Sequence, residues 1–159
     1  MSSPDCPLCR KLAECRELPP GEVVWEFPGS VAFLGPWQYY HGYCVLVART
    51  HARELFHLGE AARRAYLDEM CVLAQAIDGA FRPRKLNCEM LGNQVPHLHW
   101  HVFPRSADDP EALQAVWLAL DRAGRDEGQK RRLETGPLDR PATAARIRDV
   151  LLTLQAPRA

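Results

Sequence analysis

The segment Val95-Pro96-His97-Leu98-His99-Trp100-His101-Val102-Phe103 holds three of the chain's six histidines at alternate positions. Its polar residues alternate with apolar residues rich in Val, Trp and Phe, which is typical of a β-strand. Side chains alternate between the two faces of a strand, so all three imidazoles are expected to point to one side, with neighbours roughly 6.5 to 7 Å apart. One histidine on a strand is usually structural, but each of three would need its own hydrogen-bond partner or water. The row therefore favours a functional site.

Further strands and one long helix are expected around this segment. The amphipathic helix spans residues 59–81, and the short connections between strands favour an α+β fold with an antiparallel sheet over a parallel doubly wound one. After Pro104-Arg105 the sequence changes in character, with a charged, exposed stretch at 124–136 between two helices. The other predicted strands are 23–27, 31–34, 44–48 and 86–91, and the two later helices are 111–123 and 141–154.

Composition limits the classes of protein that fit the chain. A chain of 159 residues with 47% hydrophobic and 25% charged residues is expected to form a soluble domain with a core that needs no disulfides. A net charge of zero argues against a broad electrostatic nucleic-acid binder, and no apolar run approaches the length of a membrane span. The N-terminus has no apolar leader, so the six cysteines are expected to be reduced in the cytoplasm, with Cys44 and Cys71 buried.

The histidine segment resembles the signature of the histidine triad (HIT) superfamily, and about residues 4–106 share the family's order of elements. Within the family, the pattern is most similar to a bacterial branch labelled diadenosine tetraphosphate hydrolase. The resemblance implies a HIT-like fold with a five-stranded antiparallel sheet and a long helix in a homodimer. It also implies a catalytic domain at 1–106, with residues 107–159 as a helical extension packed on the same domain. The matching segments are Cys6–Cys9, Val31–Leu34, Tyr43–Ala48 followed by His51, Gly92-Asn93, Pro104-Arg105 and Asp108-Asp109-Pro110.

The resemblance also implies a nucleotide hydrolase or nucleotidyl transferase acting at an α-phosphate of a dinucleoside polyphosphate, phosphoramidate or similar substrate. His99 takes the nucleophile's place, and His101 would hold the phosphate oxygens. A neutral imidazole can attack phosphorus and give a phosphohistidine that water hydrolyses. Fixed donors must meet the charge on the phosphoryl oxygens, and Asn93, Gln94 and Asn87 are candidates. Ordinary turn chemistry is the alternative explanation for Asn93 and Gln94.

Cys6 and Cys9 form a Cys-x-x-Cys motif, which is half of a typical structural zinc site. In zinc-bearing members of the superfamily, the other two ligands are a histidine after the third strand and the first histidine of the triad. These positions are His51 and His97 here, which predicts a structural zinc. Such a zinc would brace the strand that carries His99. A redox pair and a motif without metal remain alternatives.

The nucleobase is expected to lie against Phe33 and Leu34. Many family members have an acidic residue just after this position to hold the ribose, whereas this chain has Gly35-Pro36. In the family, C-terminal tails often shape the partner's substrate site, and Trp117 is a candidate for this role or for simple packing.

Two other functions stay open. One is a metal-dependent phosphohydrolase in which His97, His99 and His101 bind a catalytic zinc. The other is a nucleotide-binding regulatory or scaffold protein with weak activity, which the missing acidic residue favours slightly.

Overall fold

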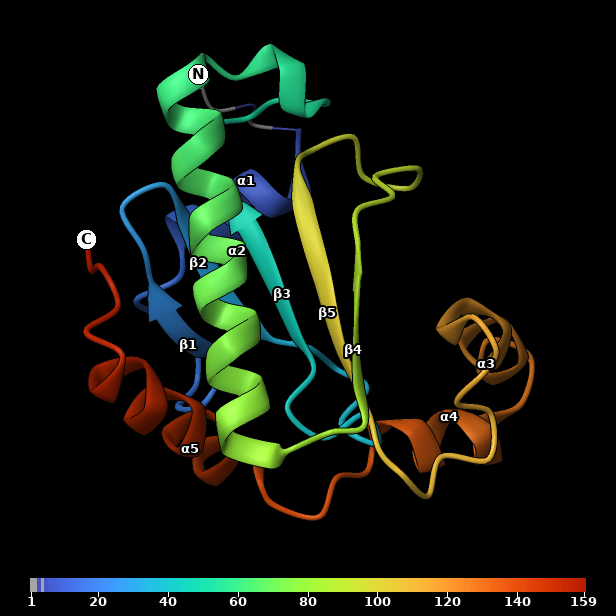
Figure 1. Cartoon of the computed structure of the whole chain (residues 1–159). Coiled ribbons are helices and arrows are strands. Elements are labelled where there is room, and N and C mark those ends of the chain that lie inside the picture. The colour runs from blue at the N-terminus through green and yellow to red at the C-terminus, as the bar shows by residue number, and fades with distance from the viewer. Residues whose placement is uncertain (1–2, 4) are drawn as a thin grey trace.

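Five strands form one antiparallel sheet in the computed structural model, which describes residue 3 and residues 5–159 (Figure 1). The order across the sheet is β1-β2-β3-β5-β4, and every neighbouring pair is antiparallel. The predicted α+β fold is thereby confirmed. The strands are β1 (Val23–Glu26), β2 (Ser30–Leu34), β3 (Cys44–Ala48), β4 (Lys85–Glu89) and β5 (His99–Arg105).

Five α-helices and one 3-10 turn surround the sheet in the described part of the chain. The charged stretch 124–136 contains a helix that the sequence analysis did not predict. Asp126 begins it by accepting a hydrogen bond from Gln129 N at 2.8 Å, and Leu133 is buried. None of the helices in residues 5–159 is long and apolar enough to cross a membrane. The helices are α1 (Pro7–Ala13), η1 (Leu55–His57), α2 (Glu60–Phe81), α3 (Val116–Ala123), α4 (Glu127–Glu134) and α5 (Arg140–Thr153).

One face of the sheet is fully covered by α2 and α5 and forms the main core. Leu73 and Ile77 of α2 recur at helical spacing and are completely buried. They belong to the same cluster as Leu46 and Val102 of the sheet and Ile147 of α5. Figure 1 shows α2 lying along the sheet with α5 beside it.

The opposite face is covered only at its two sides. At one side α1 contributes Leu8 to a cluster with Phe33 and Val47. At the other side α3 and α4 cover the aromatic residues Tyr43 and Phe103, and Figure 1 shows these two helices set apart from α2. The part of the sheet between the two covers stays accessible, and β3 and β5 cross it.

The regular part of β5 begins at His99, four residues later than predicted. Pro96 has no N–H to donate, and His97 N turns back to the carbonyl of Val95 at 2.8 Å. The predicted alternation nevertheless holds, because Leu98 packs into the main core while His99 lines the accessible side. The prediction for the thiols is correct for Cys44 and wrong for Cys71, which is exposed on α2.

Candidate functional site

A pocket of about 550 Å³ occupies the accessible part of the sheet between α1 and α3. Its floor comes from β2, β3 and β5, and the loop 91–95 forms a further wall. No carboxylate is found among the lining residues that the structure describes. The lining consists of Leu8, Lys11, Phe33, Pro36, Trp37, Tyr43, Val45, Val47, Leu91, Gly92, Asn93, Gln94, Val95, His99, His101 and Trp117.

The ring of His99 is oriented by the backbone of His97. Nδ1 of His99 lies 2.6 Å from the carbonyl oxygen of His97. A carbonyl oxygen only accepts, so Nδ1 carries the proton and donates it. Nε2 of His99 is then left with a lone pair, and the ring borders the pocket with 9% of the residue exposed. A neutral imidazole in this tautomer is a nucleophile.

His101 lies beside His99 and is enclosed by aromatic rings. The two imidazole centroids are 4.9 Å apart at 77°, and Tyr43 and Phe103 stack at 6.0 and 5.8 Å from the His101 ring. Burial, with a smaller effect from neighbouring His99, lowers the pKa of His101 from 6.5 to about 4. His101 is therefore neutral near pH 7.

Cross-strand pairing fixes the direction in which the pocket extends. Phe33 on β2 pairs with Val45 on β3, which pairs with His101 on β5. The row continues to Glu89 on β4, whose carboxylate accepts a hydrogen bond from the indole N–H of Trp117. Trp117 stands edge-on to His101 at 5.0 Å. The pocket thus has a Phe33 end and a Trp117 end, with His101 between them.

Cys6, Cys9, His51 and His97 converge next to this pocket, with their ligand atoms all within 4.8 Å of one another. Nδ1 of His97 lies 3.4 Å from Cys6 Sγ, 3.6 Å from Cys9 Sγ and 3.3 Å from His51 Nδ1. Tetrahedral zinc with ordinary bond lengths separates sulfur and nitrogen ligands by about 3.3–3.8 Å. The cluster fits such an ion.

The second nitrogen of His97 supports the same conclusion. Nε2 lies 2.7 Å from the carbonyl oxygen of Ala48, so it carries the proton and leaves Nδ1 free to ligate. His97 therefore belongs to the cysteine cluster, whereas Nδ1 of His99 is engaged by the backbone. The three triad histidines do not converge on one point, contrary to what a catalytic zinc held by all three would require.

Five of the seven residues predicted for catalysis or substrate binding line the pocket: Phe33, Asn93, Gln94, His99 and His101. Leu34 and Asn87 do not. Leu34 is 1% exposed and packs in the core against α2, because adjacent residues of a strand face opposite sides. This placement corrects the expectation that Leu34 contacts the base.

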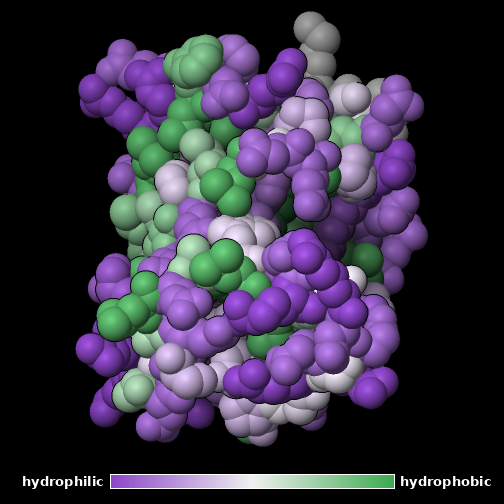
Figure 2. All heavy atoms as spheres, turned by 90° about the vertical axis from the view of Figure 1, so that its right-hand side faces the viewer, coloured by the Kyte–Doolittle hydropathy of each residue, from purple (hydrophilic) through white to green (hydrophobic). Residues whose placement is uncertain are grey.

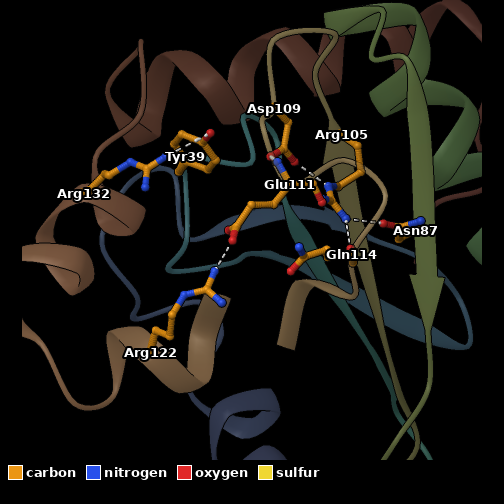
Figure 3. A network of polar contacts seen from close by, with 8 residues as sticks. All are labelled: Tyr39, Asn87, Arg105, Asp109, Glu111, Gln114, Arg122 and Arg132. Carbon is orange, nitrogen blue, oxygen red and sulfur yellow. Dashed lines mark hydrogen bonds and ion pairs between the residues drawn. The ribbon is translucent and has the colours of Figure 1, made fainter. Parts of the chain in front are cut away.

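Asn87 does not line the pocket, and its side-chain oxygen accepts a hydrogen bond from Arg105 (Figure 3). Arg105 is 2% exposed and donates to Asp109 at 2.6 Å, Asn87 at 3.0 Å and the carbonyl of Gln114 at 2.8 Å. It also donates to the carbonyl of Glu111. A buried guanidinium with hydrogen bonds from all three of its nitrogens fixes the loop 106–115, which leads into α3.

The sequence analysis did not predict several of the residues that line the pocket. Lys11 follows the cysteine motif by two positions, and Tyr43 precedes β3. Neither has a local pattern that marks it as functional. Trp117 was left between two roles, and the structure places it at the pocket of its own chain. Its hydrogen bond to Glu89 could be predicted only by knowing that α3 lies beside β4.

Comparisons with known proteins identify the family. The family model described as "HIT domain" matches residues 17–108. The curated protein hit of Bacillus subtilis is 28% identical over 103 residues, which are 62% of this chain and 70% of that protein. The chain belongs to the HIT family.

Two solved structures share the fold. A hypothetical histidine triad nucleotide-binding protein of Sulfolobus tokodaii is 18% identical, with a TM-score of 0.68 and 94% of both chains covered. A Zn-bound histidine triad family protein of Mycobacterium smegmatis is 16% identical, with a TM-score of 0.67 and 96% of both chains covered. At these identities the likeness concerns the fold.

Proposed function

We propose that the protein is a nucleotide hydrolase or nucleotidyl transferase that reacts at the α-phosphate through a phosphohistidine on His99. The observation that carries this proposal is the 2.6 Å hydrogen bond from Nδ1 of His99 to the carbonyl of His97. It orients the ring, places a proton on Nδ1 and leaves Nε2 as the attacking atom of the neutral imidazole. A buried histidine with a purely structural role does not need an open pocket beside its free nitrogen.

In the first step, Nε2 of His99 forms a bond to phosphorus while the bond to the leaving group breaks, and the leaving group takes a proton from solvent or from the pocket. In the second step, water attacks the phosphorus, the P–N bond breaks and the imidazole is regenerated. His101, Asn93 and Gln94 line the same pocket and are the proposed donors to the phosphoryl oxygens. Transfer to an alcohol or phosphate in place of water gives the transferase reaction.

We propose that Cys6, Cys9, His51 and His97 hold a structural zinc. The ligand spacing supports this, as does the Zn-bound family protein of Mycobacterium smegmatis. Zinc would supply a rigid cross-link between α1, the chain after β3 and the residue whose carbonyl orients His99. The chemistry at phosphorus stays with the histidines.

We also propose that the protein is located in the cytoplasm and forms a homodimer. All six cysteines are unpaired, and Cys71 and Cys88 are exposed, which suits a reducing compartment. The strands β1 and β4 are the two edges of the described sheet, and we propose β4 as the edge where a second copy pairs.

Intact-protein mass spectrometry during turnover tests the function. The substrates are diadenosine polyphosphates, adenosine phosphoramidate and an aminoacyl-adenylate, and the matched control is His57→Ala, which changes an exposed histidine outside the pocket. We expect an adduct of nucleotidyl mass in the wild type and in His57→Ala, and none in His99→Ala. Full turnover by His99→Ala would refute the mechanism. Tight nucleotide binding without turnover would favour the regulatory or scaffold alternative.

A further inference from the structure

Lys11 is a cation at the Phe33 end of the pocket, where the lining is otherwise apolar. Its ammonium nitrogen lies 4.6 Å from the centroid of the Phe33 ring. Leu8, from the preceding turn of α1, and Pro36 line the same region. No ion pair to Lys11 within 4.0 Å is found in the part of the chain that the structure describes.

Glu22 offsets this charge only in part. Glu22 is the carboxylate whose field reaches Lys11, but its Oε1 already accepts a hydrogen bond from Nε of Arg140 at 2.6 Å. The guanidinium of Arg140 adds positive charge of its own, and it is fixed by bonds to the carbonyls of Leu34 and Gly35. Burial lowers the pKa of Lys11, as expected for an ammonium without a close counterion.

The position of Lys11 relative to the reacting histidine follows from the sheet. Phe33 and His101 lie in one cross-strand row with Val45 between them. Neighbouring strands are about 4.8 Å apart, so the Phe33 end is about 10 Å from His101. A lysine has a flexible four-carbon stem and three donors, which lets its ammonium meet a group placed between these points. The pocket therefore offers donors for one phosphate at the histidines and a separate cation farther along.

The face of the molecule on the α3 side is mostly polar. Figure 2 shows it as mostly hydrophilic, with hydrophobic side chains in small separate groups. Lys11 is half-buried and lines the pocket. The part of its charge that Glu22 does not offset is available to a ligand in the pocket.

We propose that Lys11 selects a nucleotide that carries a second phosphate on its ribose, in addition to the phosphate that reacts at His99. This inference rests on the proposed function and adds the substrate class. Lys11 binds the ribose phosphate by a charge-assisted hydrogen bond, and the apolar walls beside it strengthen that bond by limiting access of water. A nucleotide with free ribose hydroxyls leaves the ammonium without a partner and binds more weakly.

Calorimetric titration of the full chain tests this proposal without turnover. The ligands are adenosine 5′-monophosphate, adenosine 3′,5′-bisphosphate, adenosine 2′,5′-bisphosphate and guanosine 5′-monophosphate. The variants are Lys11→Met, Lys11→Arg and the surface control Lys130→Met. Lys130 does not line the pocket and forms an ion pair with Glu127 at 3.7 Å. Equal thermal midpoints show that the variants are folded.

We expect at least one bisphosphate to bind the wild type about tenfold more tightly than adenosine 5′-monophosphate. Lys11→Met should reduce this preference to under about twofold, while Lys11→Arg and Lys130→Met keep it. The preferred isomer tells which ribose oxygen carries the phosphate.

Three outcomes would overturn the proposal. The first is binding of the monophosphate with no preference for either bisphosphate. The second is a preference that survives Lys11→Met. The third is a loss in Lys11→Met that depends on the base and not on the second phosphate, which would make Lys11 a base-reading residue. If none of the four ligands binds and His99 forms no adduct, the proposed function fails together with this inference.

Discussion

The phenol oxygen of Tyr43 lies 2.7 Å from Nδ1 of His101, so the tautomer of His101 follows from which of these two groups donates. Burial raises the pKa of Tyr43 far above its ordinary value, so the phenol keeps its proton. No other acceptor for this hydroxyl is found in residues 5–159. The hydroxyl therefore donates to Nδ1, and a neutral His101 carries its own proton on Nε2.

Tyr43→Phe should reduce turnover by about tenfold to a hundredfold, because it removes the group that holds the Nε2–H tautomer of His101. The free energy of unfolding should fall by about 1–3 kcal/mol, since Nδ1 is left buried without a partner. Nitrogen NMR of the imidazole reports the tautomer directly. An unchanged tautomer with unchanged kcat would contradict the assignment.

The free energy of unfolding should depend on the protonation of His101 between about pH 4 and pH 6.5. The pKa of His101 is about 4 in the folded chain and about 6.5 in its ordinary state. The unfolded chain thus binds more protons in this range, and stability falls as the pH is lowered through it. At pH 5 the loss relative to pH 7 should be about 2 kcal/mol from this group.

Urea unfolding of the wild type and of His101→Asn at pH 7 and pH 5 measures this contribution. The difference between the two proteins isolates His101, because the other histidines are common to both. Parallel losses on acidification in the two proteins would show that His101 does not titrate as described.

Local periodicity accounts for the parts of the fold and site that the sequence could predict. The alternation around His99 and the helical spacing of Leu73 and Ile77 are properties of short segments. They predicted β5 and α2, although β5 begins at His99 and not at Val95. The Cys6-x-x-Cys9 motif is also local, and the family resemblance was enough to assign His51 and His97 as the other two ligands.

The parts of the site that the sequence could not predict depend on contacts between distant segments. Lys11 meets Phe33, and Trp117 meets Glu89, only because of how the helices are placed on the sheet. Neither pair leaves a spacing pattern in the sequence. The error on Leu34 is of another kind, since strand alternation already forbids Phe33 and Leu34 from facing the same pocket.

Arg105→Met should destabilise the protein strongly, by about 3–5 kcal/mol, because Asp109 would be left buried without its cation. It should also loosen Trp117, since the loop fixed by Arg105 leads into α3 (Figure 3). The matched control is Arg125→Met, which breaks an ion pair of the same i,i+4 spacing, to Asp121, with 78% and 62% of the two side chains exposed. The control should cost under about 1 kcal/mol.

Urea unfolding and the tryptophan fluorescence of folded protein in ligand titrations are the measurements for this pair. Equal losses of stability in Arg105→Met and Arg125→Met would mean that the buried network contributes no more than a surface pair. A pocket that binds nucleotide normally in Arg105→Met would show that α3 is held by other contacts.

Metal removal should weaken nucleotide binding through α1, although none of the four residues proposed to bind zinc lines the nucleotide pocket. Cys6 and Cys9 lie at the start of α1, and the same helix carries Leu8 and Lys11 into the pocket. Loss of the metal frees this helix from His51 and His97, so the Phe33 end loses its wall and the carbonyl that orients His99 loses its support.

Cys9→Ala should therefore contain less than one zinc per chain, melt at lower temperature and bind nucleotide more weakly. Cys88→Ala, which removes an exposed thiol outside the cluster, should match the wild type in all three. Elemental analysis, thermal unfolding and calorimetry decide the matter. A Cys9→Ala protein that retains zinc, or that loses zinc with unchanged stability and affinity, would show that the cluster does not build the pocket.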